Sequence, residues 1–291
     1  MTKRRWTAAD LPDMAGRTVL VTGASGGLGL IISREFARVG ARVVMTVRDL
    51  ERGRAVAERI TGEVEVRRLD VSELAEVRAF ASAWSGPVDV LVHSAAAFGG
   101  PVDRTAEGFD RQTATNAWGP FALTKLLLPA VTDRVVWASS QLHRWGQVRW
   151  GDLTWRRHRY RPMAAYLDSK LYVVLFSAEL QRRLRRADAS VRSVVAHPGM
   201  VATAAVAGTP VRLLNRFPRL LNDVRRGALP MLYAATEDVP GNAYIGPDGP
   251  AGFKGHPASG RPSRTGRDSA VARRLWRSAA SLTGLPAAIR V

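Results

Sequence analysis

Two residues that could move a proton, Tyr166 and Lys170, lie four positions apart in the stretch Tyr-Leu-Asp-Ser-Lys. A step of four residues along a helix places two side chains on one face, so the lysine ammonium can lie near the tyrosine phenol. A neighbouring positive charge favours the ionised phenolate and lowers the pKa of Tyr166. A tyrosine tuned in this way is a usable general acid at neutral pH, which makes the pair a candidate for proton transfer.

The segment around this pair predicts an amphipathic helix. Its expected buried stripe follows helical spacing through Leu167, Leu171, Val174 and Ala178. Tyr166 and Lys170 then lie on an adjoining face. Tyrosine and lysine also occur at this spacing by chance, so the pair alone is equally compatible with a purely structural helix, and other motifs must decide.

A glycine-rich turn precedes the pair by more than a hundred residues. Glycines 23, 27 and 29 follow the apolar run Val19-Leu20-Val21 and come before an amphipathic run at 30–39. Glycines at these positions let the backbone turn tightly, bring its amides against a pyrophosphate and pack the next helix onto the strand. A structural turn is the alternative, but the placement between strand and helix favours a nucleotide-binding loop.

The elements that must position these residues alternate along the chain. Apolar, β-branched runs predict six strands, which are Arg17 to Thr22, Arg42 to Val47, Val64 to Leu69, Val88 to Val92, Arg134 to Ala138 and Val191 to Ala196. Helix-length segments separate them. Continuous apolar strands of this kind belong to a parallel sheet that is covered on both faces. The sequence therefore predicts an α/β fold with a doubly wound parallel sheet, in a single domain of 291 residues.

Right-handed crossovers place the loops that follow parallel strands along one edge of the sheet. The segments that come directly after predicted strands are the glycine loop, Arg48, Asp70, Ser94, Ser140 and 197–199. We therefore expect these distant positions to converge at one site.

At this point the chain resembles the short-chain dehydrogenase/reductase family, whose nucleotide loop reads Thr-Gly-x-x-x-Gly-x-Gly; the match runs through residues 17–246. The resemblance implies a Rossmann-type fold and an oxidoreductase that interconverts a carbonyl and an alcohol by hydride transfer with a nicotinamide cofactor. It assigns cofactor contacts in the glycine loop to Gly23, Ser25, Gly27, Leu28 and Gly29. It assigns the catalytic set to Asn116, Ser140, Tyr166 and Lys170.

The resemblance also implies a role for each catalytic residue. Ser140, the second serine of Ser139-Ser140, holds the substrate carbonyl, Tyr166 exchanges the proton, and Lys170 also binds the nicotinamide ribose. Asn116 binds a water of the proton relay. Pro120 supports this, because a proline four residues on has no N–H for the Asn116 carbonyl, which predicts a kinked helix within 110–128; a kink without function is the alternative.

Further cofactor contacts follow from the same resemblance. Asp70 and Val71 meet the adenine, Ser94, Ala95 and Ala96 border the cofactor, and Pro198, Gly199, Val201 and Thr203 meet the carboxamide and phosphates. The residue after the second strand selects the cofactor. Arg48 is a fixed cation suited to a phosphate, so NADP(H) is favoured over NAD(H), although Asp49 stands beside it and a solvated surface arginine is the alternative.

One motif departs from the family pattern. His93-Ser94-Ala95-Ala96 stands where the family has Asn-Asn-Ala-Gly, so the hydrogen bonds of the first asparagine must be made differently, with His93 as one candidate. An imidazole that only fills a core position is the alternative, and it is favoured over a catalytic role for His93. The departure leaves open a nucleotide-sensing protein without turnover. Reduction of an activated double bond is a further alternative, because related reductases use the same tyrosine to protonate carbon.

The substrate is expected to be lipophilic or bulky. Ser140 and Tyr166 are 26 positions apart, longer than in most family members, and the intervening loop carries Trp145, Trp150 and Trp155. This resembles the retinol-dehydrogenase-like and protochlorophyllide-reductase-like branch, although an aromatic surface loop without a substrate role is the alternative. Residues 203–222 predict a small substrate lid, with an ordinary surface excursion equally compatible.

Charge and composition bound the partners. The 43 basic and 25 acidic residues give a formal net charge of +18, but the arginines are scattered, so we expect a small-molecule substrate and no specific nucleic-acid or membrane partner. The chain has no cysteine, and no metal site is predicted. No apolar run resembles a signal peptide or is long enough to span a bilayer, which favours a cytoplasmic protein.

The remaining expectation concerns assembly. The resemblance implies a homodimer formed through the helices that contain Asn116 and Tyr166. The tail at 252–291 is rich in Pro, Gly, Ser and Arg before a short helical pattern at 270–282, which is either a dimer element or without function.

Overall fold

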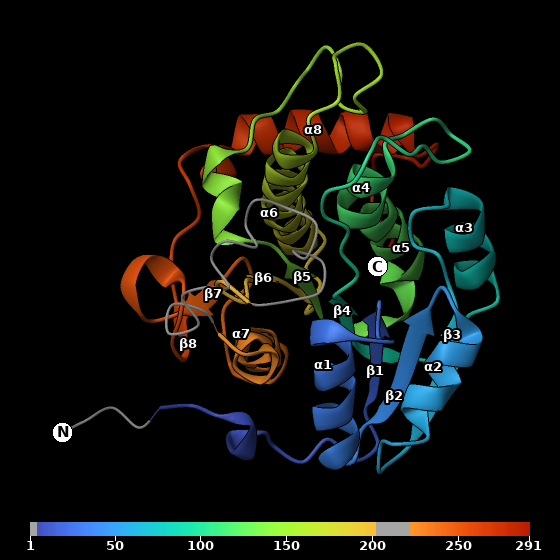
Figure 1. The fold of residues 1–291 in the computed structure, drawn as a ribbon, viewed down its shortest axis with the longest axis vertical. Helices are drawn as coiled ribbons and strands as arrows, with labels where there is room; N and C mark the ends of the chain where they lie inside the picture. The colour runs from blue at the N-terminus through green and yellow to red at the C-terminus, as the bar shows by residue number, and fades with distance from the viewer. Residues whose placement is uncertain (1–4, 202–221) are drawn as a thin grey trace.

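A single mixed sheet organises the protein (Figure 1). The computed structural model describes residues 5–201 and 222–291, so the predicted lid at 203–222 lies, apart from Asn222, outside the described residues. Within these ranges eight strands follow the order β3-β2-β1-β4-β5-β6-β7-β8. The first seven run parallel, and β8 runs antiparallel to β7 at one edge.

Six strands lie where the sequence predicts them, to within three residues. The strands are β1 (Thr18–Thr22), β2 (Arg42–Val47), β3 (Val64–Arg68), β4 (Val88–His93), β5 (Val131–Ala138), β6 (Arg192–Ala196), β7 (Tyr244–Pro247) and β8 (Pro257–Ser259). The last two were not predicted. They are short and contain proline and glycine, which weaken the alternating or continuous apolar pattern by which a strand is found.

Helices cover both faces of the sheet, which confirms the doubly wound prediction. They are α1 (Gly27–Arg38), α2 (Leu50–Ala57), α3 (Leu74–Ser82), α4 (Arg111–Thr113), α5 (Gly119–Leu127), α6 (Pro162–Arg186), α7 (Val224–Thr236) and α8 (Ser269–Leu282). One apolar core joins the sheet to α1 and α7. The other joins the opposite face to α3, α5, α6 and α8.

The carboxyl ends of the central strands meet at one edge. Val21 of β1 is level with Val92 of β4, Val92 with Val136 of β5, and Val136 with Val194 of β6. The segments that follow these strands therefore start side by side, as the crossover rule predicts.

The predicted helix at 110–128 is interrupted. A π-helix at Ala114–Trp118 separates α4 from α5, and the Gly119 N–H bonds to the Ala114 carbonyl five residues back. Pro120 lies in the first turn of α5, where a missing N–H costs little. Gly119 has no side chain because a Cβ there would overlap the backbone of Val71. The sequence thus indicated an irregular helix but not its form.

The amphipathic prediction for α6 is wrong in part. Its middle is buried on every side from Asp168 to Ser177, while Leu167 and Ala178 of the expected stripe are only half-buried. The cause is α8, which crosses the α5–α6 layer on the side away from the sheet (Figure 1). Trp276 of α8 is buried against the rings of Phe121 and Phe176.

The last residues of the chain are tied to the same layer. Lys125 of α5 donates to the carbonyls of Pro286 and Ala288, and both Arg183 of α6 and the Trp276 indole donate to that of Ala287. The predicted tail helix at 270–282 is thus confirmed as α8, and within this chain it covers the outer surface of α5 and α6.

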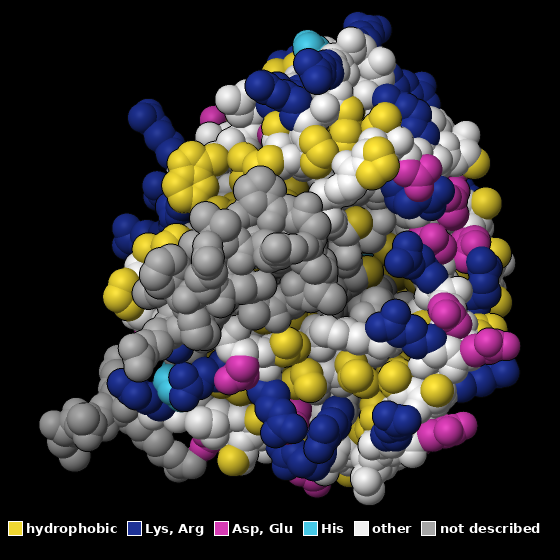
Figure 2. All heavy atoms as spheres, viewed as in Figure 1, with side chains coloured by type: hydrophobic (Ala, Val, Ile, Leu, Met, Phe, Trp, Pro, Cys, Tyr) yellow, Lys and Arg dark blue, Asp and Glu magenta, His cyan; other side chains and the backbone are white. Residues whose placement is uncertain are grey.

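The surface of the described residues carries no single basic patch on the face in Figure 2, where arginines and lysines are mixed with acidic and apolar side chains. Many arginines are engaged in local structure; Arg111, for example, pairs with Glu73 and Asp103. Within residues 5–201 and 222–291, no helix is both long and apolar enough to cross a bilayer.

We expect Trp276→Ala to lower the free energy of unfolding by about 3–5 kcal/mol, because it removes a fully buried indole from between α5 and α6. Urea denaturation measures the change. Arg277→Ala, an exposed neighbour on α8, is the matched control and should change stability by less than about 0.5 kcal/mol. Equal effects of the two substitutions would contradict the assigned packing role of α8.

Candidate active site

The first two catalytic candidates meet where β5 ends and α6 begins. Ser140 follows β5 and caps a short 3₁₀ helix at Gln141–Trp145, with its Oγ accepting from Leu142 N–H at 3.2 Å. The side chains of Ser140 and Tyr166 share a hydrogen bond. Ser139 points elsewhere, because its hydroxyl donates to the Lys170 carbonyl at 2.9 Å. The structure therefore distinguishes the two serines by their partners.

Tyr166 is half-buried in the first turns of α6, and the ring of Phe98 packs edge-on against it with centroids 4.6 Å apart. Burial raises the pKa of Tyr166 above its ordinary value, because the phenolate loses hydration. The hydrogen bond with Ser140 opposes this shift by stabilising the phenolate. The raised pKa keeps the hydroxyl protonated throughout the neutral range.

Lys170 is buried one turn further along α6. Its Nζ donates to the Ala138 carbonyl at 3.1 Å and lies 5.7 Å from the centre of the Tyr166 ring. Loss of hydration lowers the pKa of Lys170 to about 8. An ammonium with a pKa near 8 loses its proton before a phenol with a raised pKa ionises. The sequence led us to expect that Lys170 lowers the pKa of Tyr166. In this structure burial of the phenol dominates instead, and the pKa of Tyr166 is raised.

Asn116, in the π-helix, ties the loop after β4 to α6. Its side-chain Oδ1 accepts from Ala97 N–H at 2.7 Å, and its Nδ2 donates to the Ala97 carbonyl at 2.9 Å and to Ser169 Oγ at 3.0 Å. Ser169 in turn donates to the Tyr166 carbonyl at 2.7 Å. Both N–H groups of the side chain and its oxygen are thus engaged in holding structure. The predicted relay water would have to bind the Asn116 backbone carbonyl, which stays a prediction.

The glycine loop fits a dinucleotide. A Cβ on Gly23 would lie 2.7 Å from Ala95 Cα, and one on Gly29 would lie 2.5 Å from the Gly23 carbonyl oxygen, so neither position tolerates a side chain. Gly27 has φ +54° and open space in front of it. Gly26 caps α1 without a side-chain acceptor, which leaves the first amides of this helix available to a phosphate.

Thr22 is a residue whose role sequence reasoning missed. Its buried Oγ1 accepts from the backbone N–H groups of both Ser94 and Ala95, each at 3.1 Å. This holds the loop after β4 against β1 and keeps Ala95 beside Gly23. The only sequence signal for this contact is the threonine at the start of the glycine motif. The loop that it holds is 72 residues away, so no local pattern identifies the partner.

His93 does not replace the hydrogen bonds of the family's first asparagine, which the sequence had suggested as one possibility. Its Nε2 lies 2.6 Å from Thr124 Oγ1 of α5, and its ring packs against Trp137 with centroids 4.7 Å apart. Burial lowers the pKa of His93 to about 3, so the imidazole is neutral. His93 therefore fills a core position, and Thr22 supports the departing motif.

Asp70, a predicted adenine contact, makes hydrogen bonds within its own turn. One carboxylate oxygen of Asp70 accepts from the Ser72 N–H at 2.9 Å and from its hydroxyl at 2.6 Å, and the other lies 3.7 Å from Arg111. Val71 is buried. The structure places both residues just after β3, at the same edge as the glycine loop, and their contact with an adenine stays a prediction.

Arg48 and Asp49 have different surroundings. Arg48 is exposed, whereas the Asp49 carboxylate caps α2 by accepting from Arg52 N–H at 3.0 Å. The Arg52 guanidinium reaches toward the glycine loop, 3.4 Å from where a Cβ of Gly26 would lie. Among the described residues neither Arg48 nor Arg52 has an ion-pair partner.

The remaining cofactor candidates lie around the same edge. Ser25 and Leu28 lie in the glycine loop and the start of α1, and Ala96 follows Ala95. Gly199, at φ +73°, packs against the Phe253 carbonyl, and Val201 pairs with Asn222. The Pro198 carbonyl accepts from Asn222 Nδ2 at 3.1 Å. Thr203 lies outside the described residues.

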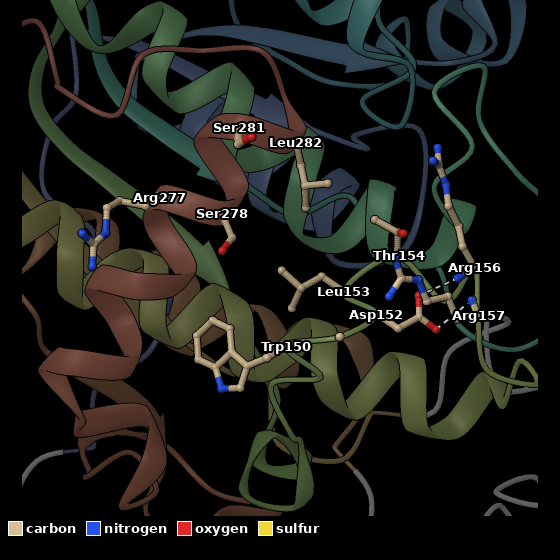
Figure 3. Close-up of a pocket in the computed structure, with 11 residues that line it drawn as sticks. Trp150, Asp152, Leu153, Thr154, Arg156, Arg157, Arg277, Ser278, Ser281 and Leu282 are labelled. Atoms are coloured by element: carbon tan, nitrogen blue, oxygen red, sulfur yellow. Dashed lines mark hydrogen bonds between the residues drawn. The ribbon is translucent and has the colours of Figure 1, made fainter.

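A separate cavity of about 550 Å³ opens between the loop at 150–157 and the C-terminal half of α8 (Figure 3). Trp150, Leu153 and Leu282 supply apolar side chains there, and Arg157 and Arg277 border it. None of the four catalytic candidates lines it. Trp155 is fully buried beneath the Arg149 guanidinium, and Trp150 is half-buried. Of the three tryptophans in this long loop, only Trp145 is strongly exposed. The cavity is therefore separate from the four catalytic candidates.

Comparison with known proteins is consistent with this geometry. A family model described as short chain dehydrogenase matches residues 17–151. Polyprenol dehydrogenase of Mus musculus is 37% identical over 94% of this chain and 86% of its own length, and retinol dehydrogenase 13 of Homo sapiens is 34% identical over the same shares. The crystal structure of an uncharacterised protein from Mycobacterium paratuberculosis matches with a TM-score of 0.87 and 42% identity, covering 99% of this chain and all of that one.

We expect Thr22→Val to weaken both the fold and cofactor binding, because two buried N–H groups lose their acceptor while the side chain keeps its shape. The free energy of unfolding should fall by about 1–3 kcal/mol. Urea denaturation and a fluorescence titration with NADP⁺ measure the two effects. Thr22→Ser keeps the hydroxyl and is the control; if Val and Ser variants bind NADP⁺ equally well, Thr22 does not shape the site.

Proposed function

This chain belongs to the short-chain dehydrogenase/reductase family, and from that premise we propose that it interconverts a lipophilic carbonyl and its alcohol with NADP(H), using Ser140, Tyr166, Lys170 and Asn116. The coarser part stands on the comparisons alone: the chain is a dehydrogenase of alcohols and carbonyls with a fold that binds NAD(P). The observation that carries the finer proposal is the hydrogen bond between Ser140 and Tyr166, with the Lys170 ammonium alongside.

The chemistry follows from where the protons reside. A bound nicotinamide cofactor supplies or accepts the hydride. In the reducing direction Ser140 and Tyr166 hold the carbonyl oxygen by hydrogen bonds, and Tyr166 gives it a proton as negative charge develops there. Burial keeps Tyr166 protonated until it is needed. General acid help of this kind contributes about 10²–10⁴-fold, and orientation of the substrate adds to it.

Lys170 contributes a charge that depends on pH. Because its pKa is about 8, it is cationic at neutral pH and loses its proton above that value. As the cation it stabilises the phenolate that Tyr166 becomes after giving up its proton, at the 5.7 Å separation from the ring. The role proposed for Lys170 is therefore to support the tyrosine after proton transfer rather than to ionise it beforehand.

NADP(H) is the proposed cofactor because of the charges after β2. Arg48 and Arg52 are exposed cations without ion-pair partners among the described residues, and both lie at the start of α2 near the glycine loop. Asp49, which could repel a phosphate, is occupied as the cap of α2. Two free guanidinium groups beside the adenosine end of the site favour a 2′-phosphate.

A lipophilic substrate is proposed on two grounds. Trp145, at the end of the short helix that begins after Ser140, is 61% exposed, and Met163 at the start of α6 is also exposed. Both therefore present apolar surface within a few residues of the catalytic candidates. The similar proteins named above act on a polyprenol and a retinol, long apolar alcohols, by their names.

Three other expectations from the sequence concern a nucleotide sensor, a homodimer and the location of the protein. The departing motif at 93–96 is the only argument for a nucleotide sensor without turnover, and in this structure Thr22 holds the loop that carries the motif. The implied homodimer through α5 and α6 and the cytoplasmic location stay predictions. Any pairing surface on α5 and α6 would have to include α8, which covers them.

We expect Tyr166→Phe to reduce kcat for carbonyl reduction by at least about 10²-fold while NADPH binding changes less than about twofold, because only the proton donor is lost. Stopped-flow NADPH oxidation with a panel of aldehydes and ketones, together with a binding titration, measures both. Tyr160→Phe, a tyrosine outside the proposed catalytic set, is the control. Retained turnover in Tyr166→Phe would remove the assigned role, and no turnover in the unmodified protein would favour the sensor.

Arg48→Asp should lower kcat/KM for NADPH by about tenfold or more and raise the preference for NADH, because a carboxylate repels the 2′-phosphate and can accept from a ribose hydroxyl. Steady-state kinetics with both cofactors give the ratio. Arg54→Asp makes the same charge change at an exposed position in the last turn of α2 and should leave the ratio within about twofold. An unchanged ratio in Arg48→Asp would end the argument for phosphate recognition.

A further inference from the structure

His143 is a fully buried imidazole three residues after Ser140, and the proposed mechanism does not use it. Its Nδ1 lies 2.8 Å from the Ser140 carbonyl oxygen, and its Nε2 lies 3.0 Å from the backbone nitrogen of Ser263. Ser263 belongs to the C-terminal tail, 120 residues away along the chain. One ring therefore joins the catalytic serine to the tail.

The proton on this ring can be assigned from its partners. A backbone N–H can only donate, so Nε2 must offer its lone pair to Ser263. The hydrogen of the neutral ring is then on Nδ1, where it donates to the Ser140 carbonyl. Burial lowers the pKa of His143 to about 4, which agrees with a ring that stays neutral. The Tyr244 hydroxyl, which lies 3.2 Å from Nδ1 and donates to Gln141 Oε1 at 3.3 Å, packs beside the same ring.

The tail end of this connection is anchored independently. Ser263 Oγ accepts from Gly266 N–H at 3.0 Å, and Gly266 packs closely on Val174 of α6. Asp268 then caps α8, which is held on α5 and α6 by Trp276. A second contact with the tail comes from Arg144, whose guanidinium donates to the Arg261 carbonyl at 2.6 Å. The Ser263 N–H is therefore presented to His143 from a fixed backbone.

These contacts bear on how Ser140 is aimed. The Ser140 carbonyl accepts both the His143 backbone N–H, at 3.0 Å, and its Nδ1. Two donors on one oxygen fix the peptide plane that follows Ser140, and with it the backbone from which the Ser140 side chain extends toward Tyr166. We propose that His143 is a positioning residue for Ser140 and that it carries the support of the C-terminal segment 260–268 into the active site. The inference rests on the catalytic role proposed for Ser140.

Variants of His143 separate its two hydrogen bonds. In His143→Asn the side-chain amide lies where Nδ1 was and can still donate to the Ser140 carbonyl. In His143→Gln the longer side chain reaches the position of Nε2 and can accept from Ser263, but it has no donor at the Nδ1 position. His143→Ala lacks both. Circular dichroism and thermal unfolding identify which variants are folded.

In the full-length protein with NADPH and an active carbonyl substrate, we expect His143→Ala to lower kcat by about 10–100-fold with NADPH affinity unchanged within twofold. The pH limb that belongs to Tyr166 should move to higher pH, because a misdirected Ser140 no longer stabilises the phenolate. His143→Asn should recover most of the lost kcat, and His143→Gln should recover less.

A double-mutant cycle with Ser140→Ala tests whether His143 acts through the serine. In the Ser140→Ala background His143→Ala should cost less than about twofold more, because there is no hydroxyl left to aim. An equal loss in both backgrounds would overturn the positioning role, and so would equal recovery by His143→Asn and His143→Gln. If His143→Ala does not fold, the comparison of His143→Asn with His143→Gln is the deciding test. Full activity of Ser140→Ala would instead overturn the proposed catalytic set.

Discussion

The hydrogen bond between Ser140 and Tyr166 joins the end of β5 to the first turns of α6, and the proposed chemistry depends on its geometry. Neither residue can adjust alone, since one begins a short helix and the other belongs to a helix of 25 residues. The two elements must therefore be held in register by contacts outside the site. Ser139, which bonds to the Lys170 carbonyl, is one of these contacts.

Burial has opposite effects on the two titrating groups of α6. It raises the pKa of Tyr166 and lowers that of Lys170, because both charged forms lose hydration. At neutral pH the result is a protonated phenol beside a lysine that still carries its charge but holds it weakly. This combination suits a donor that must keep its proton until the substrate oxygen becomes basic, and a cation that then steadies the phenolate.

The C-terminal tail is an integral part of the catalytic domain. It adds β8 to the sheet edge, reaches His143 through Ser263, and ends in α8 and a segment bound by Lys125 and Arg183. α8 also explains why α6 is buried all round: a helix between a sheet and another helix has no solvent face in its middle. The helix that carries Tyr166 and Lys170 is thereby supported on both sides.

The sequence by itself determined the parallel sheet, the glycine loop and the pairing of Tyr166 with Lys170, because strand periodicity, glycine positions and helical spacing are relations between residues close in the chain. Pro120 also predicted an irregular helix around Asn116, although the π-helix was unforeseen. The hold of Thr22 on the Ser94 loop, the link from Ser263 to His143 and the burial that sets the pKa of Tyr166 were decided only by the tertiary structure. Those features arise where segments 70 to 120 residues apart pack together, and no local pattern encodes which segments will meet.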